Sequence, residues 1–192
     1  MKVISESEFK KRLLKKLNAI NHGWIDGDRE KTTSQKADMV NHPLKIAIEI
    51  KDDTKYKIEI PSHGTMISSG EDLTEMNKRF GDDIRSANRK LLSYPGYKTV
   101  LIIRTSLPIA DVIRYAIEGP KSLHINNETL QVEYVSRQRK YSDYVFKHIG
   151  CFLIFNNKGY YFSDSRAESE CKFKRDEVEK IFGINFEEVN QI

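Results

Sequence analysis

The segment from Ala37 to Lys51 constrains the fold more than any other, because its second half alternates as only a strand does. Successive side chains of a strand point to opposite faces, so Glu49 and Lys51 share one face and the intervening Ile50 faces the other way. The apolar residues 46–48 indicate an internal strand rather than a solvated edge. A carboxylate and an ammonium at the end of such a strand are costly to bury without a partner or a purpose.

A hairpin is predicted to bring a further acid beside this pair. Residues 41–43 (Asn-His-Pro) are typical of a turn, and the apolar residues 39–40 before them would form the other arm. Such a hairpin can return Asp38 to the side of Glu49. Two carboxylates and the Lys51 ammonium would then converge on one point.

Composition excludes several classes of protein. The 192 residues, 39% hydrophobic and 31% charged, fit one soluble globular domain with a sizeable core. The sequence holds no apolar run of membrane-spanning length and no signal peptide, so we expect a cytoplasmic protein. Neither Cys151 nor Cys171 has metal-ligand spacing, and the histidines, His148 included, are scattered, so no zinc site and no disulfide framework are expected. The net charge of +4 permits a polyanionic partner without requiring one.

Hydrophobic periodicity predicts the remaining elements. Helices are expected over residues 5–20, 72–93, 109–118 and 176–182, and further strands over residues 55–60, 98–104, 130–135, 151–155 and 160–162. Ser5 and Glu8 have the spacing of a capping box at the first helix. The order of helix, three strands, helix, strand, helix and later strands predicts an α/β structure with a central mixed sheet.

Glu6 lies within the apolar stripe of the first helix when about 100° is allowed for each residue. Two interpretations of this acid stay open. It is either a third carboxylate of the site or an acid in water that favours the helix N-terminus.

The paired carboxylates are chemically suited to a hard divalent cation. Two carboxylates within ~4 Å repel each other by roughly 1–4 kcal/mol, and a cation relieves more of this repulsion than Lys51 alone. Mg²⁺ (or Mn²⁺) prefers oxygen ligands, which Asp38, Glu49 and the backbone carbonyl of Ile50 would supply. A neighbouring lysine can act on the attacking water or on charge developing at phosphorus. These parts suit metal-assisted hydrolysis of a phosphodiester.

The order of these residues resembles the PD-(D/E)xK nuclease superfamily. The resemblance covers roughly residues 5–118: Asp38 at the start of a hairpin, Glu49-Ile50-Lys51 on an apolar strand, and a later helix and strand. It implies a restriction-endonuclease-like core of αβββαβα order, with the central mixed β-sheet flanked by helices and additional C-terminal strands. Residues 1–119 would form this core, and residues 120–192 a C-terminal extension packed on the same domain.

The resemblance also implies roles. The family's counterparts of Asp38 and Glu49 bind Mg²⁺, that of Lys51 assists the water, and the acid on the first helix corresponds best to Glu6. Ala37 stands where the family often has proline. A Mg²⁺-dependent DNA endonuclease is therefore expected, and the likeness to restriction enzymes and junction resolvases suggests a homodimer. Arg85 or Asn88 of the long helix is a weaker candidate for assisting the site.

Basic and aromatic residues supply candidates for contact with DNA. Residues 136–148 interleave the two kinds; basic groups bind phosphates, and aromatic rings stack on unpaired bases. The same segment also fits a solvated loop whose aromatic rings enter the core. The candidate DNA-binding residues are Lys31, Lys36, Arg137, Arg139, Lys140 and Tyr141.

Two other functions stay open beside a DNA endonuclease that uses metal-activated water. One is a catalytically inactive nucleic-acid-binding or structural module on the same fold, and the other is a nuclease directed at RNA. An interpretation without chemistry is a solvated pair of Glu49 and Lys51 on a half-exposed strand, which would contribute little stability.

Overall fold

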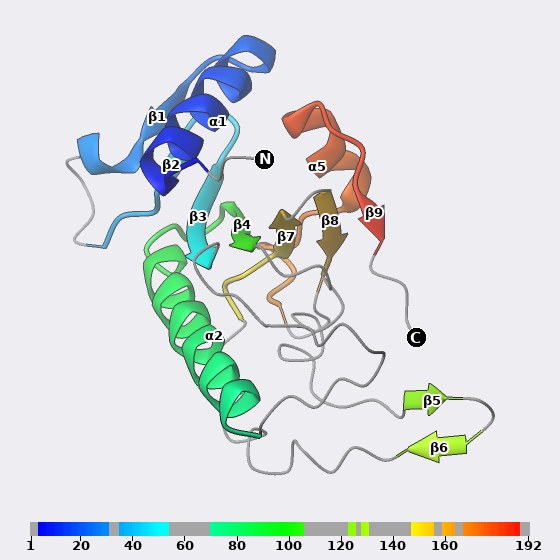
Figure 1. The fold of residues 1–192 in the computed structure, drawn as a ribbon. Helices are drawn as coiled ribbons and strands as arrows, with labels where there is room; N and C mark the ends of the chain where they lie inside the picture. The colour runs from blue at the N-terminus through cyan, green and yellow to red at the C-terminus, as the bar shows by residue number, and fades with distance from the viewer. Residues whose placement is uncertain are drawn as a thin grey trace.

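The protein is an α/β structure, seen here in a computed structural model that describes residues 4–30, 35–53, 70–105, 123–125, 128–130, 147–155, 159–163 and 167–188 (Figure 1). The helices within these residues are α1 (Glu6–Ile20), α2 (Gly70–Leu91) and α5 (Arg175–Phe182), with a 3₁₀ turn η1 (Gly27–Arg29). The strands are β1 (Trp24–Asp26), β2 (Met39–Asn41), β3 (Ile46–Asp53), β4 (Lys98–Thr105), β5 (Leu123–Ile125), β6 (Glu128–Leu130), β7 (Cys151–Phe155), β8 (Gly159–Phe162) and β9 (Glu187–Glu188).

A seven-stranded mixed sheet in the order β1-β2-β3-β4-β7-β8-β9 forms the centre of the molecule. The β1–β2, β2–β3 and β7–β8 pairs are antiparallel, whereas β3–β4, β4–β7 and β8–β9 are parallel. Strands β5 and β6 form a separate antiparallel pair. Parallel strands at the centre of a sheet are covered on both faces, which explains why residues 100–103 of β4 are apolar without alternation and why the strand is almost completely buried. The predicted central mixed sheet is confirmed.

Helices cover both faces of this sheet and divide the core in two. Leu17 of α1 and Phe182 of α5 pack with Ile48 on one face. Leu91 of α2 packs with Ala47 on the other. Because side chains alternate along β3, successive residues lie in different cores. Figure 1 shows α2 apart from α1 and α5.

The start of α1 follows from its sequence. Ser5 is the N-cap, and its hydroxyl accepts a hydrogen bond from the Glu8 N–H at 3.2 Å. The Glu8 carboxylate pairs with Arg12 at 2.7 Å. The Ser5 half of the predicted capping box, the bond from the Glu8 N–H to the Ser5 hydroxyl, is therefore present. The Glu8 side chain pairs with Arg12 one turn along the helix.

Most predicted elements within the described residues are confirmed. The hairpin, the first helix, the strand predicted at residues 98–104, the hairpin of β7 and β8 and the last helix lie where expected, and the long helix lies two residues earlier than predicted. The predicted strand at 55–60 and helix at 109–118 fall outside the described residues. The short strands β5 and β9 were not predicted, and β6 overlaps the predicted strand at 130–135 only at Leu130.

Strands β7, β8 and β9 extend the same sheet, because β7 pairs with β4 along Val100–Arg104, β8 pairs with β7 and β9 pairs with β8. The predicted boundary between residues 119 and 120 falls outside the described ranges. Within those ranges, no helix combines the length and the apolar character needed to cross a membrane.

Candidate active site

β2 and β3 diverge at Asp38, and the Asp38 carboxylate lies where they part. The register pairs Met39 with Ile48, so Asp38 and Glu49 are the next opposing residues. The backbone carbonyl of Asp38 turns away to accept the Gly27 N–H at 3.0 Å. Its side-chain Oδ2 accepts the Ile50 N–H at 2.8 Å. A carboxylate thus replaces a backbone acceptor of the strand ladder, and this fixes its position.

Glu49 is the most buried charged group of the site, with a side chain only 1% exposed. Its Oε1 lies 2.7 Å from the Lys90 Nζ and 3.1 Å from the Lys51 Nζ. Its Oε2 is buried and has no hydrogen-bond partner among the described residues. A buried acceptor without a partner costs free energy, and a group that paired with this oxygen would remove that cost.

The protonation of Glu49 is correspondingly unusual. Burial, and then the charge of Asp38, raise the pKa of Glu49 to about 7, although a hydrogen bond from Lys90 and the charges of Lys51 and Lys90 act in the opposite direction. The charge of Asp38 thus disfavours the ionised form of Glu49. The pKa of Glu49 thus lies near neutral pH, and a further cation beside the carboxylate would lower it.

The lysines around Glu49 come from two elements. Lys51 follows Glu49 on β3 and also reaches Ser86 of α2 at 3.4 Å. Burial alone would lower the pKa of Lys90, but the hydrogen bond to Glu49 and the charges of Glu49 and Asp38 hold that pKa above its ordinary value. Lys90 is therefore a cation and not a base.

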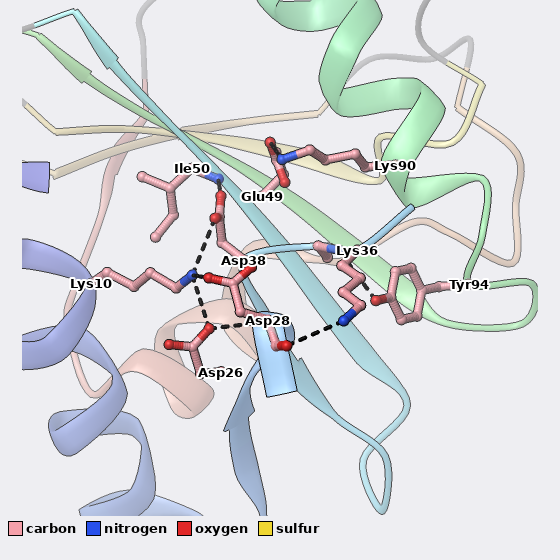
Figure 2. Close-up of polar contacts among 10 residues, drawn as sticks. Lys10, Asp26, Asp28, Lys36, Asp38, Glu49, Ile50, Lys90 and Tyr94 are labelled. Atoms are coloured by element: carbon pink, nitrogen blue, oxygen red, sulfur yellow. Dashed lines mark hydrogen bonds and ion pairs between the residues drawn. The ribbon is translucent and has the colours of Figure 1, made fainter. Parts of the chain in front are cut away.

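A third lysine approaches Asp38 from α1, as Figure 2 shows. The Lys10 Nζ lies 3.0 Å from Asp26, 3.4 Å from Asp38 and 3.6 Å from Asp28. Burial alone would raise the pKa of Asp26, but hydrogen bonds from the Lys10 ammonium and from the Asp28 N–H hold that pKa below its ordinary value. One ammonium thus balances three carboxylates beside the strand divergence.

Of the two interpretations of Glu6, its exposure in the first turn of α1 favours the second, an acid in water at the helix N-terminus. The residue of α1 that reaches Asp38 is Lys10, which the sequence analysis missed. A catalytic role of Glu6 thus stays a prediction without a contact to support it.

A hydrogen-bond chain that is buried at Ala37, Tyr94 and Glu30 and exposed at His42 holds the segment that leads to Asp38. The Ala37 N–H donates to the Tyr94 hydroxyl at 3.2 Å, and that hydroxyl donates to Glu30 at 2.5 Å. The other Glu30 oxygen lies 3.3 Å from the His42 Nε2, and the His42 Nδ1 lies 2.9 Å from the Tyr97 hydroxyl. These contacts connect the residues on either side of β2 and the residue after η1 with the turn after α2.

The structure thus brings Asp38, Glu49, Ile50 and Lys51 to one end of the β2–β3 hairpin, as the sequence predicted. Two residues of α2, Ser86 and Lys90, contact Lys51 and Glu49. The two residues of α2 that the sequence suggested as assisting the site have other partners. Arg85 forms an ion pair with Asp82 at 3.0 Å, and the Asn88 side chain accepts the His148 N–H at 3.0 Å. Lys90 follows the inward Ala87 by three positions, a spacing that could have indicated it.

The DNA-contact candidates are mostly untested by the structure. Lys36 is described, and its Nζ donates to the Asp28 carbonyl at 3.1 Å (Figure 2). The others lie outside the described residues: Lys31, Arg137, Arg139, Lys140 and Tyr141.

The donor set at the hairpin fits a hard cation. Asp38 and Glu49 offer carboxylate oxygens, and the unpartnered Oε2 of Glu49 is an acceptor of the kind that Mg²⁺ prefers. The Ile50 carbonyl belongs to the same edge of β3 as its N–H, which faces Asp38.

Comparison of the chain with protein-family models, with curated proteins and with solved structures gives no match.

Proposed function

We propose that the protein is a Mg²⁺-dependent (or Mn²⁺-dependent) endonuclease that hydrolyses phosphodiester bonds of DNA, on a restriction-endonuclease-like core. The observation that carries this proposal is the buried, unpartnered Oε2 of Glu49. Glu49 stands opposite Asp38 where β2 and β3 diverge, and it is two residues before Lys51 on β3. A buried carboxylate repelled by a second one is a costly arrangement that a divalent cation would stabilise.

Asp38, Glu49 and the Ile50 carbonyl would hold the ion. When bound, Mg²⁺ would supply Lewis acidity toward a phosphate oxygen and the attacking water. Lys51 and Lys90 both bind Oε1, so Oε2 is left for this role.

The chain's own side chains have distinct roles in this proposal. The Lys51 ammonium stabilises the negative charge that develops on the phosphate during attack. Lys90 is a positioning residue, because its hydrogen bond favours the ionised form of Glu49. Lys10 positions Asp38 through the ion pair at 3.4 Å. The basic candidates Lys36 and Arg137 would bind the DNA backbone.

One observation favours a second function. Lys51 and Lys90 already share one oxygen of Glu49, so part of the charge is balanced by the protein itself. A module that binds nucleic acid without cutting it would need nothing more from these residues. The same assay distinguishes the two, and it includes RNA as a substrate.

The purified chain is incubated with plasmid DNA, single-stranded DNA and RNA, with Mg²⁺ or Mn²⁺ and then with EDTA. We expect cleavage of DNA that EDTA abolishes. Glu49→Gln and Lys51→Ala should each lower the rate by about a hundredfold or more while binding of DNA is kept. Lys16→Ala, at an exposed position of α1, is the matched control and should cut like the wild type.

Each other outcome has a definite meaning. Binding of DNA without cleavage would support the binding module, and cleavage of RNA alone would support the RNA-directed nuclease. Cleavage that survives in Glu49→Gln would contradict the proposed site, even if the protein is a nuclease.

A further inference from the structure

A second group of metal-binding side chains lies away from the hairpin, where the segment before β7 meets the segment before α5. His148, Glu168 and Cys171 present ligand atoms that all lie within 4.8 Å of one another. Among the described residues this is the only set of three or more His, Cys, Asp and Glu side chains with such spacing. The sequence analysis expected no zinc site, because the two cysteines lack metal-ligand spacing and the histidines are scattered along the chain.

We propose that His148, Glu168 and Cys171 form a binding site for a divalent transition metal of the zinc class. Imidazole nitrogen, thiolate sulfur and carboxylate oxygen are the donors that Zn²⁺ takes, whereas Mg²⁺ favours oxygen. Bonds of about 2.0–2.3 Å place the ligand atoms of a tetrahedral ion ~3–4 Å apart. Small side-chain rotations would bring these three ligand atoms, which lie within 4.8 Å of one another, to that separation. Three protein ligands leave one position for water or a further ligand.

The backbone holds all three residues in place before any ion binds. The Cys171 N–H donates to the Glu168 carbonyl at 3.0 Å, and this turn places the two side chains near each other. The Glu168 N–H donates to the Lys147 carbonyl at 2.9 Å, which brings the turn next to His148. The ligands are therefore arranged by short backbone contacts and not by long flexible loops.

Thr99 of β4 fastens both sides of the site. Its hydroxyl donates to the His148 carbonyl at 2.7 Å and accepts the Gly150 N–H at 2.8 Å. Its N–H donates to the Cys171 carbonyl at 3.2 Å. A Cβ on Gly150 would lie 1.7 Å from that same carbonyl oxygen, so only glycine permits this close approach.

Two simpler interpretations explain less of the arrangement. A His–Glu contact accounts for the 3.3 Å between the His148 Nδ1 and Glu168, but not for the sulfur beside it. A reactive cysteine needs a lowered pKa, whereas burial, with Glu168 and Glu170 nearby, raises the pKa of the Cys171 thiol. A metal ion uses all three donors at once and would join the segment before β7 to the segment between β8 and α5.

Cobalt tests the site directly, because sulfur-to-cobalt charge-transfer absorption appears only when a thiolate binds the ion. The reduced full chain is titrated with Co²⁺ and, in parallel, with Zn²⁺ by calorimetry. We expect this absorption band and about one sulfur-bound Co²⁺ per chain, with Zn²⁺ displacing it. Cys171→Ser should abolish the band, and Cys151→Ala should keep it, since Cys151 is the other buried cysteine and is not in the group.

His148→Gln and Glu168→Gln provide second variants if Cys171→Ser does not fold, and each should weaken Co²⁺ binding by about tenfold or more. A cobalt complex without the sulfur band would overturn the proposal, as would a band that persists in Cys171→Ser. The proposal is independent of the nuclease assignment, and Glu49→Gln should leave the band unchanged.

Discussion

The carboxyl of Glu49 is surrounded by groups that act on its charge in opposite directions. Burial and Asp38 favour the neutral acid, and Lys51 and Lys90 favour the carboxylate. Such a balance is easily moved by a further charge, which makes Glu49 sensitive to both pH and cations.

The balance at Glu49 predicts a pH dependence of stability in metal-free buffer. Its pKa of about 7 in the folded protein lies above the ordinary 4.5. The folded state therefore keeps a proton that the unfolded state releases, and this contribution to stability falls as the pH rises from about 4.5 to about 7. Relative to Glu49→Gln, the wild type should lose roughly 3 kcal/mol at most across this window.

Urea denaturation in EDTA at several pH values measures this difference. Glu6→Gln, at an exposed position, is the matched control and should run parallel to the wild type. A difference between wild type and Glu49→Gln that does not change with pH would contradict the burial-driven shift.

At the scale of the element, Gly27 allows η1 to approach the segment before β2, which carries Asp38. A Cβ at Gly27 would lie 1.6 Å from the Ala37 carbonyl oxygen, so the backbone would have to move. Gly81 of α2 has open space around its Cβ position. The two glycines therefore offer a matched pair of substitutions.

Gly27→Ala should destabilise the protein by about 1–3 kcal/mol and lower any metal-dependent cleavage, because it displaces the segment that holds Asp38. Gly81→Ala should stabilise it by about 0.5–1 kcal/mol, since alanine favours the helix. Chemical denaturation and the cleavage assay measure both effects. Gly27→Ala with wild-type stability would show that the close approach at Ala37 is not required.

Local patterns predicted the elements better than the contacts between them. The alternation in residues 46–51 and the apolar run at 100–103 are properties of neighbouring residues, so the hairpin and the buried parallel strand could be predicted. The pairing of Glu49 with Lys90 and the meeting of His148 with Cys171 depend on how distant segments pack. Periodicity carries no information on such contacts, and a strand of two residues such as β9 has no period to detect.

At the scale of the whole molecule, metal binding should couple to the stability of the fold, because β3 lies at the centre of the sheet. An ion at ~100 times its dissociation constant adds about 2.7 kcal/mol. At ~2–4 °C per kcal/mol for a chain of this size, Mg²⁺ or Mn²⁺ should raise the melting midpoint by several degrees.

Differential scanning calorimetry with and without Mg²⁺ measures this shift. Asp38→Asn should reduce it, while Cys171→Ser should keep it because Mg²⁺ disfavours sulfur. An unchanged midpoint at millimolar Mg²⁺ and Mn²⁺ would count against a preformed ion site at the hairpin.

The packing of α1 on α5 has a consequence for synthesis. Leu13 and Leu17 lie in one core with Val178 and Phe182, so α1 is covered by a helix that is synthesised much later. Until then the growing chain exposes the apolar side of α1 and the edge of β4 that β7 later occupies. Protection by a chaperone during translation would therefore matter more for this chain than for one whose neighbours in sequence are also its neighbours in space.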